Sequence, residues 1–311
     1  MIMPTLLFTH AACIEHDPGA HHPESPQRLQ AVLAGLEAER FQLLDRREAP
    51  RAEIDQIARV HDRDYVLAVL DAIPAEGRQS LDGDTHVSPG SGEAALRAAG
   101  AVCAAVDAVA GGDARNAFCA TRPPGHHAET ATAMGFCLFN NVAVGAAHAR
   151  AAHGIRRAAV IDFDVHHGNG TQAMFWNEPD LFYASTHQSP LYPGTGSALE
   201  RGVEDNIVNA PLAASSGSDD FRSAMTDTVL PALRKFDPDF LFISAGFDAH
   251  AADPLAMLNL QDEDYAWVTG ELMQVAAECC DGRLVSTLEG GYDLAALARS
   301  TAAHVHALMT A

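Results

Sequence analysis

Residues 158–171 have the sequence AAVIDFDVHHGNGT, in which a short apolar run is followed at once by aspartates and histidines. An apolar run of this length is typical of a strand in a parallel sheet that is covered by helices on both faces. Similar runs recur along the chain and alternate with longer segments of helical periodicity. This alternation predicts an α/β protein with a largely parallel sheet.

The six expected strands are short and mostly apolar, and they cover residues 5–9, 116–121, 158–165, 181–186, 240–245 and 283–288. The expected helices begin at Ser25, Ser91, Asn141, Ser218, Asp262 and Asp293, and several of these residues are good helix caps. We expect the last helix to expose His304 and His306. Because no repeat, linker or change in composition separates these elements, the sequence predicts a single domain over residues 1–311.

The chain of 311 residues has 20 Lys and Arg against 41 Asp and Glu, and its formal net charge is -21. This charge argues against binding to nucleic acids or anionic membranes, which require basic surfaces, and it favours cationic substrates.

No apolar run approaches the roughly 18 residues of a membrane span, and the N-terminus does not resemble a signal peptide. With six cysteines and no C-x-x-C pair, we expect a protein of the reducing cytoplasm.

Polar residues are concentrated just beyond the expected strands. Four such segments are residues 122–127, residues 162–167, Asp248 and residues 289–292. In open parallel sheets, ligands bind beyond the carboxyl ends of the strands. The sequence therefore predicts one site to which all four segments contribute.

The aspartates and histidines after residue 161 favour a metal ion. If the strand continued to His166, then Asp162, Asp164 and His166 would project from one face of it. The alternatives are an edge strand with a solvated face or a set of polar residues that bond one another, but the preceding apolar run indicates burial. Two buried carboxylates repel each other unless a cation lies between them. With Asp248 as a third ligand, the set would suit zinc, and iron(II) or cobalt would also fit.

Two further segments carry groups suited to hydrolysis. His126 and His127 follow a rigid Pro-Pro-Gly turn, and beside a metal site an imidazole can take a proton from water and give one to a departing amine. Tyr292 follows Gly290 and Gly291, and its phenol could stabilise negative charge on a carbonyl oxygen. Taken alone, the histidine pair and the tyrosine could also be structural residues.

Six segments form an ordered set of motifs: PPGHHAET (123–130), MGFCLFNN (134–141), DFDVHHGNGT (162–171), YPGTG (192–196), SAGFDAHAADPL (244–255) and LEGGYD (288–293). This set resembles the zinc-dependent histone deacetylases and deacetylase-like amidohydrolases, and LEGGY is similar to their class II branch. The matching segments extend from HHPESPQR near residue 21 to residue 293. The resemblance implies the arginase/deacetylase fold, a three-layer α/β/α domain around a mainly parallel sheet of about eight strands.

The resemblance also implies two metal sites. Asp164, His166 and Asp248 would bind the zinc ion that activates the attacking water. Asp162 would orient the first histidine of the pair and would help to hold a structural potassium ion, with Ser185 as a further ligand.

The same resemblance implies catalytic roles. His127 would act as general base and then as general acid, His126 would act mainly through its charge, and Tyr292 would donate a hydrogen bond to the substrate carbonyl. Asn169 occupies a position where many class I members have Asp. An amide can still orient His127 but adds no charge to raise the pKa of the ring, so the pH optimum should shift downward.

The family's substrate tunnel would be lined here by Phe136, Tyr192 and Leu255, and two rings and a leucine suit the methylene chain of an acylated lysine. Polyamine-selective relatives carry a Glu at the position of Leu255. We therefore expect a deacylase acting on ε-acetyl-lysine or another small acyl-amine. The alternatives are an acetylpolyamine or other small-molecule amide hydrolase, a two-manganese ureohydrolase of the arginase type, and a non-catalytic binding protein. A homo-oligomer is compatible with the sequence.

Overall fold

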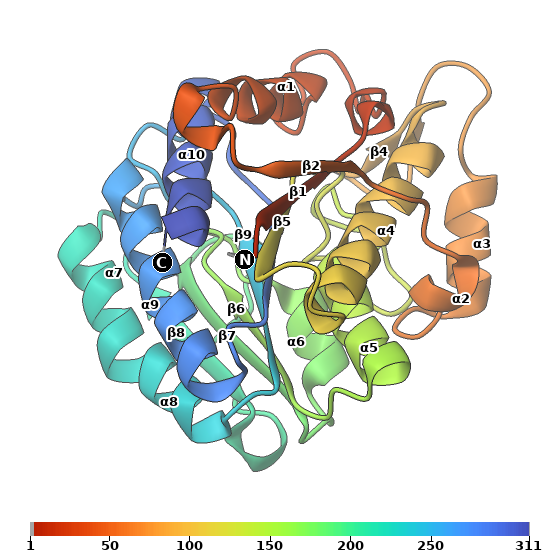
Figure 1. Ribbon diagram of the computed structural model, residues 1–311. Helices are drawn as coiled ribbons and strands as arrows, with labels where there is room; N and C mark the ends of the chain where they lie inside the picture. The colour runs from red at the N-terminus through yellow and green to blue at the C-terminus, as the bar shows by residue number, and fades with distance from the viewer. Residues whose placement is uncertain (1–2, 311) are drawn as a thin grey trace.

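The computed structural model describes residues 3–310, and a sheet of eight parallel strands forms the centre of the molecule (Figure 1). From edge to edge the strand order is β2-β1-β5-β10-β9-β6-β7-β8. The strands are β1 (Thr5–Thr9), β2 (Asp45–Glu48), β5 (Asn116–Cys119), β6 (Ala158–Asp162), β7 (Leu181–Gln188), β8 (Ile207–Leu212), β9 (Phe240–Ala245) and β10 (Leu284–Leu288). A separate antiparallel pair consists of β3 (Gln79–Ser80) and β4 (His86–Val87). The prediction of a mainly parallel sheet of about eight strands is confirmed.

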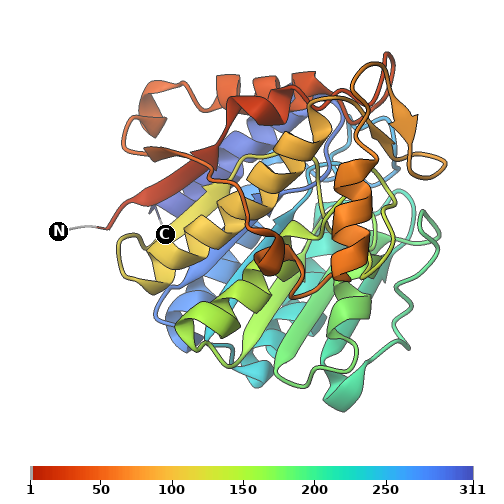
Figure 2. The same cartoon turned by 90° about the vertical axis from the view of Figure 1, so that its right-hand side faces the viewer.

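Helices cover both faces of this sheet, which gives three layers (Figures 1 and 2). One face carries α1 (Pro26–Gly35), α7 (Ser218–Ala224), α8 (Leu230–Phe236), α9 (Asp262–Cys279) and α10 (Leu294–Thr310). The other face carries α4 (Ser91–Ala110), α5 (Asn141–His153) and α6 (Asn169–Phe175), with α2 (Ile54–Ile57) and α3 (Arg63–Asp71) beside α4. Within residues 3–310, no helix combines the length and the apolar character needed to cross a membrane.

The central strands are mostly apolar because their two faces contribute to two cores. In β6, Ala159 and Ile161 belong to the core formed with α9 and α10. Ala158 and Val160 belong to the core on the opposite face, formed with α4 and α5. Successive side chains of a strand point to opposite faces, so a strand covered on both sides shows no alternation of polar and apolar residues.

The strand that begins at Ala158 ends earlier than the sequence indicates. β6 stops at Asp162, so the expected continuation to Val165, with Asp162, Asp164 and His166 on one strand face, is wrong. Oδ1 of Asp162 accepts the backbone N–H of Asp164 (3.1 Å), and Oδ1 of Asp164 accepts that of His166 (2.9 Å). Such local bonds between an aspartate and the backbone two residues on replace the sheet ladder and turn the chain.

The two histidines of α10 differ in their exposure. His306 is exposed, as expected, but His304 is fully buried, which corrects the expectation for this residue. The ring of His304 contacts the hydroxyl groups of Thr269 on α9 (2.6 Å) and Ser286 on β10 (2.9 Å). Burial lowers the pKa of His304 to about 3, so the ring is neutral at pH 7.

Candidate metal and catalytic site

The candidate site lies at the carboxyl ends of β5, β6, β9 and β10, which are neighbours in the sheet. The loop after β5 carries the histidine pair, and the turn after β6 carries Asp164 and His166. Asp248 follows β9 and Tyr292 follows β10. Four segments that are far apart in the sequence therefore meet at one edge of the sheet, as parallel topology requires.

Asp164, His166 and Asp248 lie together, with one ligand atom from each within 4.8 Å of the others. Nδ1 of His166 is 3.0 Å from Oδ1 of Asp164 and 3.2 Å from Oδ2 of Asp248. All three residues are buried. Within residues 3–310, Oδ2 of Asp248 has no hydrogen-bond partner, because its 3.2 Å contact with His166 is an ion pair without hydrogen-bond geometry. A buried carboxylate oxygen without a partner is costly, and a cation at this point would remove that cost. The donor set therefore fits a divalent metal ion.

The charges of Asp164, His166 and Asp248 also favour a divalent metal ion. Burial opposes protonation of His166, but the carboxylates of Asp164 and Asp248 outweigh it and raise the pKa of His166 to about 10. Without a metal, the two carboxylates thus hold a proton on the imidazole. A divalent cation in place of that proton would satisfy both carboxylates and leave the ring neutral.

Backbone amides hold the carboxylates in place. Oδ1 of Asp248 accepts the N–H of Val165 (2.8 Å), and Oδ2 of Asp164 accepts the N–H of Gly290 (2.8 Å). A Cβ atom on Gly290 would overlap Oδ2 of both Asp164 and Asp248. Gly290 is therefore required because the carboxylates approach the backbone closely at this residue.

A second group of three potential ligands lies away from this site, between α4 and α5. Nε2 of His148 and Nε2 of His153 each lie 2.7 Å from Oδ1 of Asp107. The guanidinium of Arg59 donates to Nδ1 of His148 (2.7 Å), and a guanidinium can only donate. The proton of a neutral His148 ring is therefore on Nε2, directed at Asp107, and no lone pair is left there for a metal ion. We assign no metal to this group.

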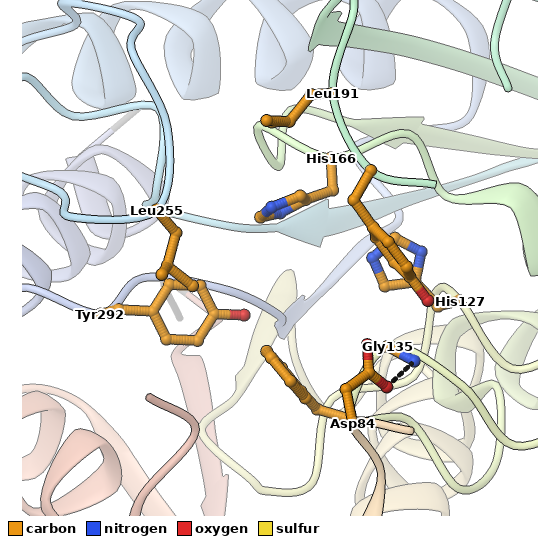
Figure 3. Close-up of a pocket in the computed structure, with 9 residues that line it drawn as sticks. Asp84, His127, Gly135, His166, Leu191, Leu255 and Tyr292 are labelled. Atoms are coloured by element: carbon orange, nitrogen blue, oxygen red, sulfur yellow. Dashed lines mark hydrogen bonds between the residues drawn. The ribbon is translucent and has the colours of Figure 1, made fainter. Parts of the chain in front are cut away.

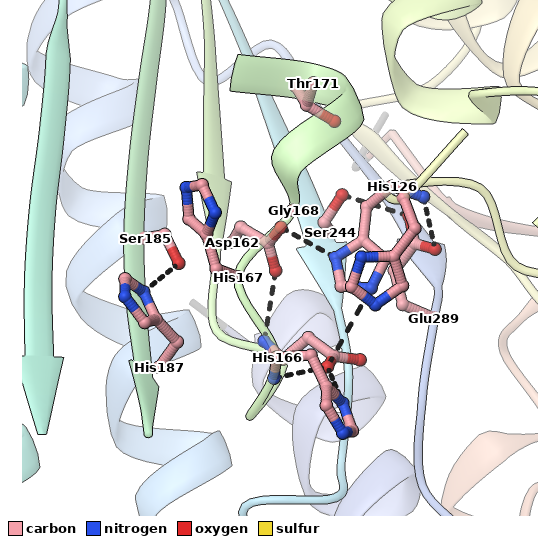
Figure 4. Close-up of polar contacts among 12 residues, drawn as sticks. His126, Asp162, His166, His167, Gly168, Thr171, Ser185, His187, Ser244 and Glu289 are labelled. Atoms are coloured by element: carbon pink, nitrogen blue, oxygen red, sulfur yellow. Dashed lines mark hydrogen bonds and ion pairs between the residues drawn. The ribbon is translucent and has the colours of Figure 1, made fainter. Parts of the chain in front are cut away.

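The two histidines after β5 lie side by side, with ring centroids 4.0 Å apart, but they have opposite electrostatic environments. Nδ1 of His126 is 2.9 Å from Oδ2 of Asp162 (Figure 4). Burial opposes protonation of His126, but the charges of Asp162 and Asp164 outweigh it and raise its pKa well above the usual value. Burial, together with the positive charges of His126 and His166, lowers the pKa of His127 well below the usual value. His127 is therefore neutral at pH 7 beside a charged His126.

Asn169 determines the tautomer of His127. The amide nitrogen of Asn169 donates to the carboxylate of Glu129 (2.8 Å), so its Oδ1 faces Nδ1 of His127 (2.9 Å). An amide oxygen only accepts, which places the ring proton of His127 on Nδ1 and the lone pair on Nε2. The ring is also held from the side, because a Cβ atom on Gly135 would overlap it.

A cavity of about 260 Å³ opens onto these groups (Figure 3). Its lining contains the three predicted tunnel residues and two of the predicted catalytic residues; the full set is Asp84, His127, Gly135, Phe136, His166, Leu191, Tyr192, Leu255 and Tyr292. The ring of Phe136 packs edge-on against Tyr292 (6.0 Å between centroids), and that of Tyr192 packs against His127 (5.2 Å). In Figure 3 the hydroxyl oxygen of Tyr292 points into the cavity.

Three residues near the cavity were given no individual role by the sequence, although Glu289 belongs to one of the four segments expected at the site. Asp84 lies on the lining and accepts the N–H of Gly135 (3.1 Å). Asp253 accepts the N–H of Leu255 through Oδ1 (3.0 Å) and that of Tyr292 through Oδ2 (2.7 Å). Burial and the charge of Asp248 raise the pKa of Asp253 to about 7. The third residue, Glu289, is fully buried, and its carboxylate contacts the histidine loop. An acidic residue just after a predicted strand was the available signal for Glu289.

The residues predicted to hold potassium are adjacent. Asp162 on β6 pairs directly with Ser185 on β7 in the sheet register. Nε2 of His187 faces the backbone oxygen of Gly196 (2.9 Å), so Nδ1 of the same ring accepts the hydroxyl proton of Ser185 (2.8 Å). This arrangement leaves the hydroxyl oxygen of Ser185 as an acceptor, and the potassium ion itself stays a prediction.

Comparison with known proteins agrees with this geometry. Residues 22–308 match the family model of the histone deacetylase domain. The chain is 37% identical to histone deacetylase 14, chloroplastic, of Arabidopsis thaliana, over 98% of this chain and 76% of that protein. It is 42% identical to the histone deacetylase-like amidohydrolase of Pseudomonas aeruginosa, over 88% of this chain and 72% of that protein. The crystal structure of the HDA15 HD domain matches with a TM-score of 0.92 and 33% identity, over 99% of this chain and 89% of that one. The chain therefore belongs to the histone deacetylase family and has the arginase/deacetylase fold.

Proposed function

We propose that the protein is a metal-dependent amide hydrolase that removes an acetyl or similar short acyl group from an amine such as ε-acetyl-lysine. The observation that carries this proposal is the convergence of a neutral histidine, a tyrosine and a group suited to a metal on one cavity. His127, His166 and Tyr292 all line it. Amide hydrolysis needs a base for water, an acid for the departing amine and a donor to the carbonyl oxygen, and this set contains all three.

Asp164, His166 and Asp248 would hold a zinc ion, with iron(II) or cobalt(II) as alternatives of similar ligand preference. When bound, the ion would supply Lewis-acid activation of both the water and the substrate carbonyl. The unpartnered Oδ2 of Asp248 supports this assignment. The direct pairing of Asp162 with Ser185 supports a structural potassium site on the same edge of the sheet.

The protein's own side chains would move the protons. His127 carries its proton on Nδ1, so its Nε2 would take a proton from the attacking water and later deliver it to the departing amine. His126 would stay protonated through its contact with Asp162 and would act by its charge. Tyr292 would donate its hydroxyl proton in a hydrogen bond to the carbonyl oxygen as negative charge develops there.

The cavity supports an acylated amine with an aliphatic stem. Phe136, Tyr192 and Leu255 contribute apolar surface along its length, and such walls favour methylene groups over charged or strongly polar ones. The side chain of Leu255 has no carboxylate that could bind a second amine of the substrate. We therefore place acyl-lysine ahead of acetylpolyamines as the substrate class.

A small cationic acyl-amine is the second candidate, and one observation favours it. Asp84 is the single carboxylate among the nine residues that line the cavity. With a formal net charge of -21 on the whole chain, the protein would attract a cationic acetylpolyamine. Direct competition between acetyl-lysine and acetylspermidine would distinguish the two candidates.

The test is zinc-reconstituted hydrolysis of a fluorogenic acetyl-lysine substrate by the wild type and by Tyr292→Phe. We expect the variant to retain its zinc and to lose kcat on the order of 10²-fold, the effect of removing one donor to the carbonyl oxygen. Equal turnover by the two proteins would remove Tyr292 from the mechanism. A zinc-loaded wild type that hydrolyses no acyl-amine in a panel including acetylspermidine would overturn the proposal and favour a binding protein.

A further inference from the structure

Glu289 is a fully buried carboxylate in the loop between β10 and Tyr292. Its side chain contacts the loop after β5, next to His126 (Figure 4). Oε2 accepts the backbone N–H groups of Gly125 (2.7 Å) and His126 (3.2 Å). Oε1 accepts the hydroxyl proton of Ser244 on β9 (3.0 Å). One side chain thus satisfies three donors that belong to two other segments of the site.

Burying a carboxylate is unfavourable, and here burial raises the pKa of Glu289 to about 7. An apolar or small residue would avoid this cost, but Gly125 and His126 would then lose their acceptor. The loop cannot easily turn to find another partner, because Gly125 is packed tightly against the backbone of Phe139 and Asn141. The carboxylate is therefore the group that fixes this side of the histidine loop.

The backbone around Glu289 is held as firmly as its side chain. Its N–H donates to the carbonyl oxygen of Ala245 on β9 (2.9 Å), and its own carbonyl oxygen accepts from the guanidinium of Arg28. The next residue, Gly290, donates to Asp164, and Tyr292 donates to Asp253 (2.7 Å). Because the backbone of residues 289–292 is fixed, the side chain of Glu289 can hold the histidine loop in a defined position.

We propose that Glu289 is a positioning residue that fixes the loop carrying His126 and His127 relative to the loop carrying Tyr292. This inference rests on the proposed function, in which His127 and Tyr292 act on the two sides of one amide group. Glu289 is neither among the residues that line the cavity nor among the candidate metal ligands, and its effect would be exerted through the backbone of residues 125 and 126. An error of about 1 Å in the alignment of such groups costs on the order of 10²-fold in rate.

Two conservative variants distinguish the effect of side-chain length from the effect of charge. Glu289→Gln keeps the length of the side chain, so its amide oxygen can accept from Gly125 and His126 while its NH2 group donates to Ser244. Glu289→Asp keeps the charge but is one methylene shorter and cannot reach the loop. We expect the Gln variant to stay within about threefold of wild-type kcat, and the Asp variant to lose kcat on the order of 10²-fold with little change in KM and full zinc content.

Hydrogen–deuterium exchange gives a readout that does not depend on activity. In a peptide covering residues 122–128, Pro123 and Pro124 have no amide proton, so uptake reports mainly on Gly125 to Ala128. We expect exchange in this peptide to be about tenfold faster in Glu289→Asp, comparable to the loss of one hydrogen bond, and unchanged in Glu289→Gln. A peptide from α8, remote from the site, is the internal control.

The outcomes distinguish the two proposals. Normal protection of residues 122–128 in Glu289→Asp would overturn the positioning role, and so would a Gln variant as impaired as the Asp variant, because charge rather than reach would then matter. An inactive zinc-loaded wild type would refute the hydrolase, whereas the exchange experiment would still decide whether Glu289 holds the loop.

Discussion

Asn169 decides which nitrogen of His127 would be available for the proposed role as a base, and it does so without adding a charge. Its amide is held by Glu129, and the pKa of His127 is lowered by burial and by the positive charges of His126 and His166. A base must be neutral to act, so activity is lost as the pH falls through its pKa. The acid limb of the kcat/KM profile should therefore lie below the usual histidine range.

A carboxylate in place of the amide of Asn169 should raise the pKa of His127. In Asn169→Asp, a carboxylate beside Nδ1 would raise the pKa of His127, but it would also face Glu129, so the change is best made together with Glu129→Gln. We expect the acid limb to move to higher pH by about one unit or more. The measurement is kcat/KM from pH 5 to 9 at saturating zinc, with Glu129→Gln alone as the control. An acid limb that stays in place would mean that it reports on a group other than His127.

The proposed metal ligands can also be tested at the scale of single residues. Asp248→Ala removes one of three donors and leaves His166 and Asp164 with an incomplete set, so we expect it to lose bound zinc and activity together. His153→Ala changes the other histidine and aspartate group and should keep the wild-type metal content. Metal analysis after dialysis gives both results. A full equivalent of zinc in Asp248→Ala would contradict the ligand assignment.

At the scale of elements, the loop after β10 depends on Gly290, which two of the proposed metal ligands approach closely. In Gly290→Ala the new Cβ would overlap Oδ2 of Asp164 and of Asp248, so one of the carboxylates must move. We expect weaker zinc binding and a lower Tm in the zinc-loaded protein. The matched control is Gly270→Ala in α9, where a Cβ would meet no atom of residues 3–310 within 4 Å. This change should leave the stability unchanged or raise it by up to about 1 kcal/mol. Equal zinc affinity in the two variants would show that the loop after β10 can move to make room for the new Cβ atom without disturbing the carboxylates.

The six strands predicted from the sequence are the central ones, because burial on both faces makes them mostly apolar. The two edge strands were missed for physical reasons. β2 has the sequence DRRE, and its charged side chains reach solvent beside a single partner strand. β8 contains Pro211, which cannot donate to a ladder and is tolerated only where one side is unpaired. Edge strands therefore lack the pattern by which buried strands are identified.

Within the site, sequence motifs indicated the proposed catalytic residues and two residues that orient them, Asp162 and Asn169, but not the carboxylates that bond the backbone of the site loops. Glu289 bonds Gly125 across 164 positions of the chain, and Asp253 bonds the backbone of Tyr292 across 39. Their partners are backbone N–H groups, which every residue except proline possesses, so the partner has no sequence signature. The early end of β6 was missed for a related reason, since an aspartate can bond the backbone of its own turn instead of continuing a strand.

At the scale of the whole molecule, several buried histidines make folding sensitive to acid. Burial lowers the pKa of His61 and His187 to about 4 and that of His167 and His304 to about 3. In the unfolded chain each would titrate near 6.5, so below that pH the unfolded state binds more protons than the folded one. The free energy of unfolding then falls as the pH falls, by up to about 1.4 kcal/mol per pH unit for each such group.

His304 offers the clearest measurement of this effect because it lies on the buried face of α10 and is not one of the candidate metal ligands. Urea unfolding at pH 7.5 and at pH 5.0 should show a large loss of stability in the wild type. The variant His304→Gln lacks one histidine with a lowered pKa. We therefore expect its free energy of unfolding to fall by about 2 kcal/mol less than that of the wild type between the two pH values, whatever the absolute stability of the variant. His306→Gln, an exposed change on the same helix, should lose as much as the wild type. If His304→Gln and the wild type lose the same free energy, then His304 accepts its proton in the folded state, and the hydroxyl groups of Thr269 and Ser286 must stabilise the charged ring.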